Sequence, residues 1–135
     1  MADIFTILGR KMKILITLLL VLFSFEATAG ELKASKYEFV KQSIGKGKPY
    51  FLEVGSDSCR SCKIMSDMLY KVSVKNPSYN IHFVNVKKER EAAFEMEIRM
   101  IPTQIIYDKD GKEVYRHIGV LSSDELNNLF KEYSF

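Results

Sequence analysis

Cysteine is scarce in this 135-residue chain, which contains two, and charge of neither sign dominates. Two cysteines can form one bridge at most, so a fold held together by several disulfides is excluded. The 20 Lys and Arg residues against 17 Asp and Glu residues give a formal net charge of +3, which offers no electrostatic reason for nucleic acid as the main partner. With 47% apolar residues, seven glycines and three prolines, the composition is that of a globular domain rather than of a wholly disordered or fibrous chain.

A long apolar run is also missing. The most apolar stretch, residues 14–25, covers 12 residues, whereas a membrane-spanning helix needs about 20. Basic residues at positions 10, 11 and 13 precede it, and Ala27-Thr28-Ala29 follows it, which is the arrangement of a secretory signal peptide with an A-x-A cleavage site. We therefore expect a signal peptide over residues 1–29, with Met12 as an alternative start, and one folded domain over residues 30–135.

Within that domain the spacing of apolar residues predicts alternating helices and strands. Asn76-Pro77 should end the second helix, Asp108–Gly111 should join the last two strands into a hairpin, and Ser122 with Glu125 forms a capping box for the last helix. The expected elements are a helix over 33–44, a strand over 50–54, a helix beginning after residue 59, a strand over 81–86, a helix over 89–98, strands over 103–107 and 113–117, and a closing helix. This order predicts an α/β fold with a central mixed sheet of about four strands flanked on both faces by about four helices.

The two cysteines are separated by two residues, in Cys59-Arg60-Ser61-Cys62, at the start of a predicted helix. Such a pair can close a small disulfide. The unsatisfied N–H groups and the dipole of a helix N-terminus stabilise a thiolate, which lowers a thiol pKa from about 8.5 to the range of about 3.5 to 7.5. Cys59 is therefore the expected nucleophile, and Cys62, one turn inside the helix, the expected resolving thiol.

Other uses of the cysteine pair remain open at this point. A structural disulfide closing so short a loop constrains the unfolded chain little. A zinc site needs four ligands, and the remaining candidates, His82 and His117, lack the spacing of a zinc motif, so we expect both to be structural or surface residues. Copper could use the two thiols with a methionine. The candidate methionines are Met65, Met68, Met96 and Met100, of which the first two lie on an apolar helical stripe.

The segment from Gly55 to Lys63, preceded by Phe51-Leu52-Glu53 and followed about forty residues later by Arg99–Thr103, resembles a thioredoxin-family domain. The resemblance covers nearly all of residues 30–135, and the segment Val114–Gly119 is similar to the family's last strand and its glycine. It implies a thioredoxin-like fold, an attacking thiol at Cys59 and a resolving thiol at Cys62.

The resemblance also assigns roles away from the cysteines. Pro102 would be a cis-proline beside the pair, leaving the backbone of Ile101 to bind an extended substrate segment. Glu53, six residues before Cys59, falls where thioredoxins carry a buried acid that helps to move the proton of the resolving thiol. The alternative for Glu53 is a partly exposed carboxylate on an edge strand.

Four positions depart from the family pattern. Ser58 replaces the usual tryptophan before the first cysteine, Arg60-Ser61 replaces Gly-Pro between the cysteines, and Phe83 falls where thioredoxins place a lysine near the buried acid. Arg60 could contact substrate and stabilise the thiolate, which would make the disulfide more oxidising, or it could be a solvated charge.

We therefore expect a periplasmic thiol–disulfide oxidoreductase that acts on cysteine-containing exported proteins, more as a reductant than as an oxidant. It would need no metal and no cofactor beyond its cysteine pair. We expect a monomer that exchanges electrons with a membrane electron-transfer protein and does not bind nucleic acid. A copper chaperone using Cys59, Cys62 and a methionine, and a redox-inert binding module on the same scaffold, are the alternatives.

Overall fold

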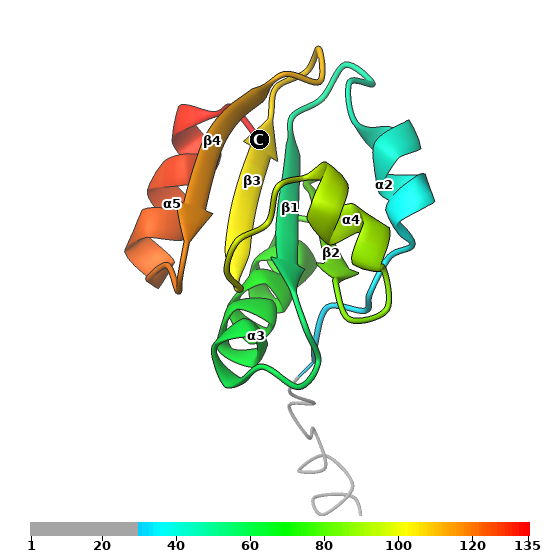
Figure 1. Ribbon diagram of the computed structural model, residues 1–135. Helices are drawn as coiled ribbons and strands as arrows, with labels where there is room; N and C mark the ends of the chain where they lie inside the picture. The colour runs from blue at the N-terminus through cyan, green and yellow to red at the C-terminus, as the bar shows by residue number, and fades with distance from the viewer. Residues whose placement is uncertain (1–29) are drawn as a thin grey trace, which may run out of the picture.

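A computed structural model describes residues 30–135, and the expected signal peptide lies outside the described residues. The domain is a four-stranded sheet in the order β2-β1-β3-β4 with helices on both faces (Figure 1), as expected from the sequence. The elements in chain order are α2 (Tyr37–Ser43), β1 (Tyr50–Gly55), α3 (Arg60–Lys75), β2 (Asn80–Asn85), α4 (Arg90–Glu95), β3 (Thr103–Tyr107), β4 (Glu113–Ile118) and α5 (Ser123–Glu132). In residues 30–135 no helix combines the length and the apolar character needed to cross a bilayer.

The sheet is mixed because β1 pairs in parallel with β2 but antiparallel with β3. The expected hairpin of β3 and β4 is confirmed. Its turn is stabilised by Asp108, whose Oδ1 accepts from the backbone N–H groups of Asp110 at 3.0 Å and Lys112 at 2.9 Å. Gly111 supplies the positive φ, +90°, that this turn requires.

Two predicted helices are shorter than expected. The segment before α2 is extended, because Ala34 forms a parallel bridge with Phe83 and the Ser35 N–H donates to the Phe83 carbonyl at 2.7 Å. The helix therefore begins at Tyr37 rather than near residue 33. The second helix, α4, was expected over residues 89–98 but ends at Glu95. Glu97 has a φ of +52°, which a continuing helix does not allow.

The local signals for the two longest helices are confirmed. Helix α3 ends where the Asn76 backbone N–H and side-chain amide both donate to the Val72 carbonyl. Helix α5 begins with the predicted capping box, in which Ser122 Oγ accepts from the Glu125 backbone N–H and the Ser122 N–H donates to the Glu125 carboxylate.

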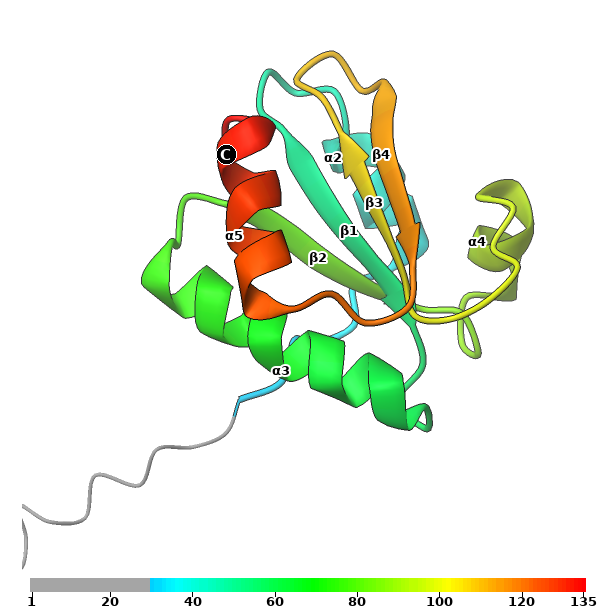
Figure 2. The same cartoon turned by 90° about the vertical axis from the view of Figure 1, so that its left-hand side faces the viewer.

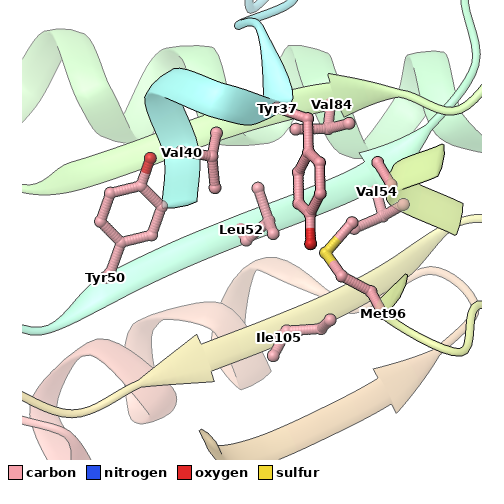
Figure 3. Close-up of a cluster of buried hydrophobic side chains, with 9 residues drawn as sticks. Tyr37, Val40, Tyr50, Leu52, Val54, Val84, Met96 and Ile105 are labelled. Carbon is pink, nitrogen blue, oxygen red and sulfur yellow. The ribbon is translucent and has the colours of Figure 1, made fainter. Parts of the chain in front are cut away.

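Apolar side chains form a separate core on each face of the sheet. Helices α3 and α5 cover one face and α2 and α4 the other (Figure 2). Alternate residues of β1 divide between the two: Leu52 and Val54 pack towards α2 and α4 with Tyr37 and Ile105 (Figure 3), whereas Phe51 packs towards α3 and α5. Glu53 therefore points to the α3 and α5 face as well, since side chains two residues apart share a face.

This topology brings distant parts of the chain to one end of the sheet. Helix α3 starts just after the C-terminal end of β1, and β3, which runs antiparallel to β1, begins at the same end, where Val54 lies opposite Thr103. The cysteine turn that precedes α3 and the Ile101-Pro102 segment that precedes β3 are therefore neighbours.

Candidate active site

Cys59 and Cys62 form a disulfide, with their Cα atoms 5.2 Å apart. Cys59 is the N-cap of α3, and its Sγ accepts a hydrogen bond from the Cys62 backbone N–H at 3.3 Å and lies 3.3 Å from Ser61 Oγ. The Cys59 side chain is half-buried, whereas Cys62 is only 2% exposed. The first sulfur is thus accessible and is placed where helix N–H groups stabilise a thiolate.

The turn before Cys59 is organised by Ser56, which is buried. Its Oγ accepts from the Ser58 backbone N–H at 3.1 Å, and its carbonyl accepts from the Cys59 N–H at 3.2 Å. Gly55 is required for packing rather than for backbone conformation. A Cβ there would lie 3.0 Å from Cys62 Sγ and 3.3 Å from the Phe83 ring, so the buried sulfur rests directly on the β1 backbone.

Pro102 is buried next to this turn, and the Ile101–Pro102 peptide bond is cis, as the resemblance implied. Two hydrogen bonds hold the segment: Thr103 Oγ1 donates to the Met100 carbonyl at 2.6 Å, and the Gly119 N–H donates to the Pro102 carbonyl at 2.9 Å. Ile101 is half-buried. The assignment of both residues to substrate binding stays a prediction.

Glu53 is completely buried in the central strand β1, so the expected burial is confirmed and the edge-strand alternative is wrong. Burial raises the pKa of its carboxyl group to about 8, partly offset by a hydrogen bond from Gln104 Nε2 at 3.0 Å. Opposite Glu53 on β2 lies Phe83, which is 5% exposed and carries no charge. A carboxyl group with a pKa near neutrality exists in both forms there, so its ionised form can accept a proton and its neutral form can return one.

Arg60, the first residue of α3, is exposed. Within residues 30–135 no hydrogen bond or ion pair involves its side chain. The structure thus brings Cys59, Cys62, Pro102 and Glu53 to one end of the sheet and leaves the guanidinium of Arg60 at the surface beside them.

The sequence patterns missed Lys87, in the loop after β2. Its Nζ donates to Ser58 Oγ at 2.5 Å, which places an ammonium group one residue from the attacking cysteine. The neighbouring Lys88 pairs with Asp57 at 3.0 Å, and that contact lowers the pKa of the Asp57 carboxyl group. No local signal identifies Lys87, because the contact depends on the parallel pairing of β1 and β2.

Gln104 was missed as well. It is fully buried in β3, opposite Glu53, and its side chain bonds to the Glu53 carboxyl group. A signal was present, since Gln104 is the one amide in the predicted strand over residues 103–107.

Of the residues considered for metal binding, the two histidines lie at opposite edges of the sheet, whereas Met100 precedes the Ile101-Pro102 segment beside the cysteine turn and is 63% exposed. His82 on β2 stacks on Tyr50, with ring centroids 5.1 Å apart, and His117 lies on β4 at the opposite edge of the sheet. Met65 belongs to the core under α3, where its Sδ accepts from the Leu121 N–H at 3.2 Å, and Met96 belongs to the core of the other face. In residues 30–135 no group of three or more His, Cys, Asp or Glu side chains could hold a metal ion.

Comparisons with known proteins agree with this geometry. Residues 38–134 match the family model described as "Thioredoxin-like domain". The chain is 30% identical over 90 residues to thioredoxin of Mycoplasmoides gallisepticum, covering 67% of this chain and 89% of that protein, and 33% identical over 76 residues to thioredoxin of Chlamydia caviae, covering 56% and 74%.

Solved structures show the same fold. A thioredoxin of Malassezia sympodialis superposes with a TM-score of 0.66 at 22% identity, covering 78% of this chain and 92% of that one. A mutant thioredoxin from Halobacterium salinarum superposes with a TM-score of 0.68 at 15% identity, covering 79% and 93%.

Proposed function

Because this chain belongs to the thioredoxin-like family and is a thiol–disulfide oxidoreductase with a redox-active cysteine pair, we propose that it reduces disulfides of exported proteins. The observation that carries the proposal is the unequal burial of the two cysteines: Cys59 is half-buried, whereas Cys62 is 2% exposed and lies on the same face of β1 as Glu53. An accessible nucleophile backed by a buried thiol and a buried acid suits a two-step exchange.

In the first step the Cys59 thiolate attacks a substrate disulfide. A Cys59–substrate bond forms, the substrate S–S bond breaks, and the first substrate sulfur leaves as a thiolate that takes a proton from water. In the second step Cys62 loses its proton to Glu53 and attacks the Cys59 sulfur. The Cys59–Cys62 disulfide forms and the second substrate sulfur leaves, so the substrate is reduced by two electrons and the enzyme is oxidised.

The segment around Pro102 supports binding of an extended substrate. Within residues 30–135 no backbone hydrogen bond uses Ile101, so its N–H and C=O are available to a bound strand. Large apolar side chains are exposed around it, with Met100 63%, Ile118 47% and Val120 43% exposed. In this proposal Ile101 and Pro102 position the substrate backbone and Arg60 contacts substrate from the other side of Cys59.

Reduction rather than oxidation is favoured by three features. The relatives with about 30% identity are thioredoxins by name. The Arg60 side chain, which could have made the couple oxidising, forms no hydrogen bond with either cysteine in residues 30–135. Ile101 before the proline is thioredoxin-like.

The proposed site of action is the periplasm, supported by the signal-peptide pattern of residues 1–29. An exported reductant must be re-reduced after each turnover, so we include a membrane electron-transfer protein as its redox partner and a monomer as its working state.

The decisive measurement is the reduction potential of the Cys59–Cys62 couple, determined by equilibration with glutathione or dithiothreitol buffers. A potential near that of thioredoxins, about −270 mV, supports a reductant, whereas one near −120 mV contradicts it. Expression of the full chain in a bacterium, followed by fractionation and N-terminal sequencing, tests export. A periplasmic chain starting at Gly30 supports it, and a cytoplasmic chain that retains residues 1–29 contradicts it.

A further inference from the structure

A series of hydrogen bonds connects the buried acid to the segment that precedes β3. Gln104 Nε2 donates to Glu53 Oε2 and to the Gly119 carbonyl, both at 3.0 Å, and the Gly119 N–H donates to the Pro102 carbonyl at 2.9 Å. Both Glu53 and Gln104 are completely buried. The bonds thereby link Glu53 of β1 and Gln104 of β3 to the residue before β3 and the residue after β4.

The backbone of Gly119 determines which way the Gln104 amide points. A backbone carbonyl can only accept, so the side-chain nitrogen, and not the side-chain oxygen, must face it. The same nitrogen then directs its second N–H to Glu53. A half-turn of the amide would place two oxygens against each other and leave the Gly119 carbonyl without its side-chain donor.

The two oxygens of Glu53 consequently differ. Oε2 accepts from Gln104 and cannot carry a proton on the side of that bond, whereas Oε1 is buried and has no hydrogen-bond partner among residues 30–135. In the neutral acid the proton therefore resides on Oε1. In the carboxylate Oε1 is the uncompensated oxygen and so the more basic one.

The resolving thiol lies on the same face of β1 as this carboxyl group. Gly55 follows Glu53 by two residues on that face, and Cys62 Sγ rests against Gly55, 3.0 Å from the position of a Cβ there. Residues two apart in a strand are neighbours on one face, with their Cα atoms about 6.6 Å apart. The inference therefore routes the proton between the two groups through one bridging water.

We propose that Gln104 is a positioning residue for the second step of the exchange, holding Glu53 so that Oε1 is the oxygen that takes the proton from Cys62. This inference rests on the proposed function. The proton leaves the Cys62 thiol for Glu53 Oε1, the Cys62 thiolate attacks Cys59, and the substrate thiolate departs. Gln104 itself gains and loses no proton.

Other ionisable groups lie on the elements around Glu53. The start of α3 carries the cysteine pair, Arg60 and Lys63, and the start of α5 carries Asp124 and Glu125. Strand β4 carries His117, which is opposite Gln104 in the register, whereas Phe83 on β2 does not titrate. A pH dependence of the second step that persists in Glu53→Gln belongs to these groups, and one that disappears belongs to Glu53.

The test follows two releases of a coloured thiolate from 5,5′-dithiobis(2-nitrobenzoic acid) in a stopped-flow instrument, with the reduced enzyme mixed at pH 5 to 10. The first release reports attack by Cys59 and is second order. The second reports resolution by Cys62 and is independent of reagent concentration. The variants are Gln104→Met, close in volume but without the amide, and Ile106→Val, a packing control on the same face of β3.

In Gln104→Met the loss of the donor raises the pKa of Glu53. We expect the inflection in the plot of second-release rate against pH to move upward by about one pH unit. The rate of the second release at pH 7 should fall about tenfold. The first release stays unchanged, and Ile106→Val changes neither phase. In a Glu53→Gln background the inflection is absent and Gln104→Met has no further effect on the pH profile.

An unchanged second release in Gln104→Met, or an equal loss of rate in the Glu53→Gln background, overturns the role of Gln104 while leaving the cysteine chemistry intact. Absence of a second release in the wild type contradicts the proposed function itself and removes the inference with it. If Gln104→Met does not fold, NMR of the reduced wild type tests the role of Gln104 instead. The Gln104 side-chain amide signals must follow the Glu53 titration and lose that response in Glu53→Gln, and signals that ignore pH refute the proposal.

Discussion

Replacing Glu53 by glutamine is expected to change how the stability of the oxidised protein depends on pH. Burial raises the carboxyl pKa in the folded state from 4.5 to about 8, while the unfolded chain keeps the ordinary value. Between these values the folded state binds a proton that the unfolded state has lost, so stability is full below about pH 4.5 and falls as pH rises towards 8.

The size of this loss follows from the shift. A difference of about 3.5 pH units at about 1.4 kcal/mol per unit gives at most about 5 kcal/mol lost between acid and alkaline pH. That is a large part of the 5 to 15 kcal/mol typical of a domain. Glutamine occupies nearly the same space but does not ionise, so Glu53→Gln should remove the pH-dependent part.

Urea unfolding of the oxidised protein, followed by circular dichroism at pH 5 to 9, measures this directly. The free energy of unfolding of the wild type should decline over that range, while that of Glu53→Gln should stay nearly level. Glu125→Gln is the matched control, because hydrogen bonds from Ser122 lower the pKa of Glu125 and its effect is therefore constant above pH 6. Parallel curves for wild type and Glu53→Gln would refute the reasoning that the acid is buried and neutral.

Three further predictions concern the cysteine turn. Cys62→Ser should accumulate mixed disulfides with substrates on non-reducing gels, because resolution is lost, and Cys59→Ser should not; equal trapping by both variants contradicts the assigned roles. Lys87→Gln and Arg60→Gln should each raise the Cys59 pKa and lower the reduction potential of the cysteine pair. The change should be roughly 20 mV for Lys87→Gln, for a charge effect of about 1 kcal/mol, and smaller for Arg60→Gln, because the Lys87 ammonium bonds to the residue before Cys59. Thiol titration measures the Cys59 pKa, and redox equilibria measure the potential. A larger effect of Arg60→Gln than of Lys87→Gln contradicts this ranking. Gly55→Ala should destabilise the oxidised protein by about 1 to 3 kcal/mol in thermal unfolding, because its Cβ would lie 3.0 Å from the Cys62 sulfur; unchanged stability means that the helix shifts to accommodate it.

Elements with local signals were predicted well from the sequence. The hairpin turn around Asp108 and the capping box of Ser122 and Glu125 depend on neighbouring residues, so their chemistry can be read from the chain directly. The helix before β1 was predicted too long because its first residues are held extended by Phe83, which is 49 positions from Ala34 in the sequence. Such a tertiary contact overrides local helix propensity.

The candidate site likewise contains residues that the sequence identified and residues that only the tertiary structure reveals. Cys59 and Cys62 were found from motif spacing, and Pro102 and Glu53 from their places in the resemblance. Lys87 was not found, since its contact with Ser58 joins residues 29 apart and exists only because β1 and β2 pair in parallel.

The extended segment before α2 bears on where this domain begins. The family match starts at residue 38, yet Ala34 and Ser35 already pair with Phe83 along the outer edge of β2, and the Leu32 N–H donates to Ser66 Oγ at 3.1 Å. A chain trimmed to the matched residues would leave that edge of β2 bare, ready to add a strand from another molecule, and would remove the donor from a buried serine hydroxyl. Residues 32–35 therefore cover the outer edge of β2, and the folded domain extends beyond the residues that the family model matches.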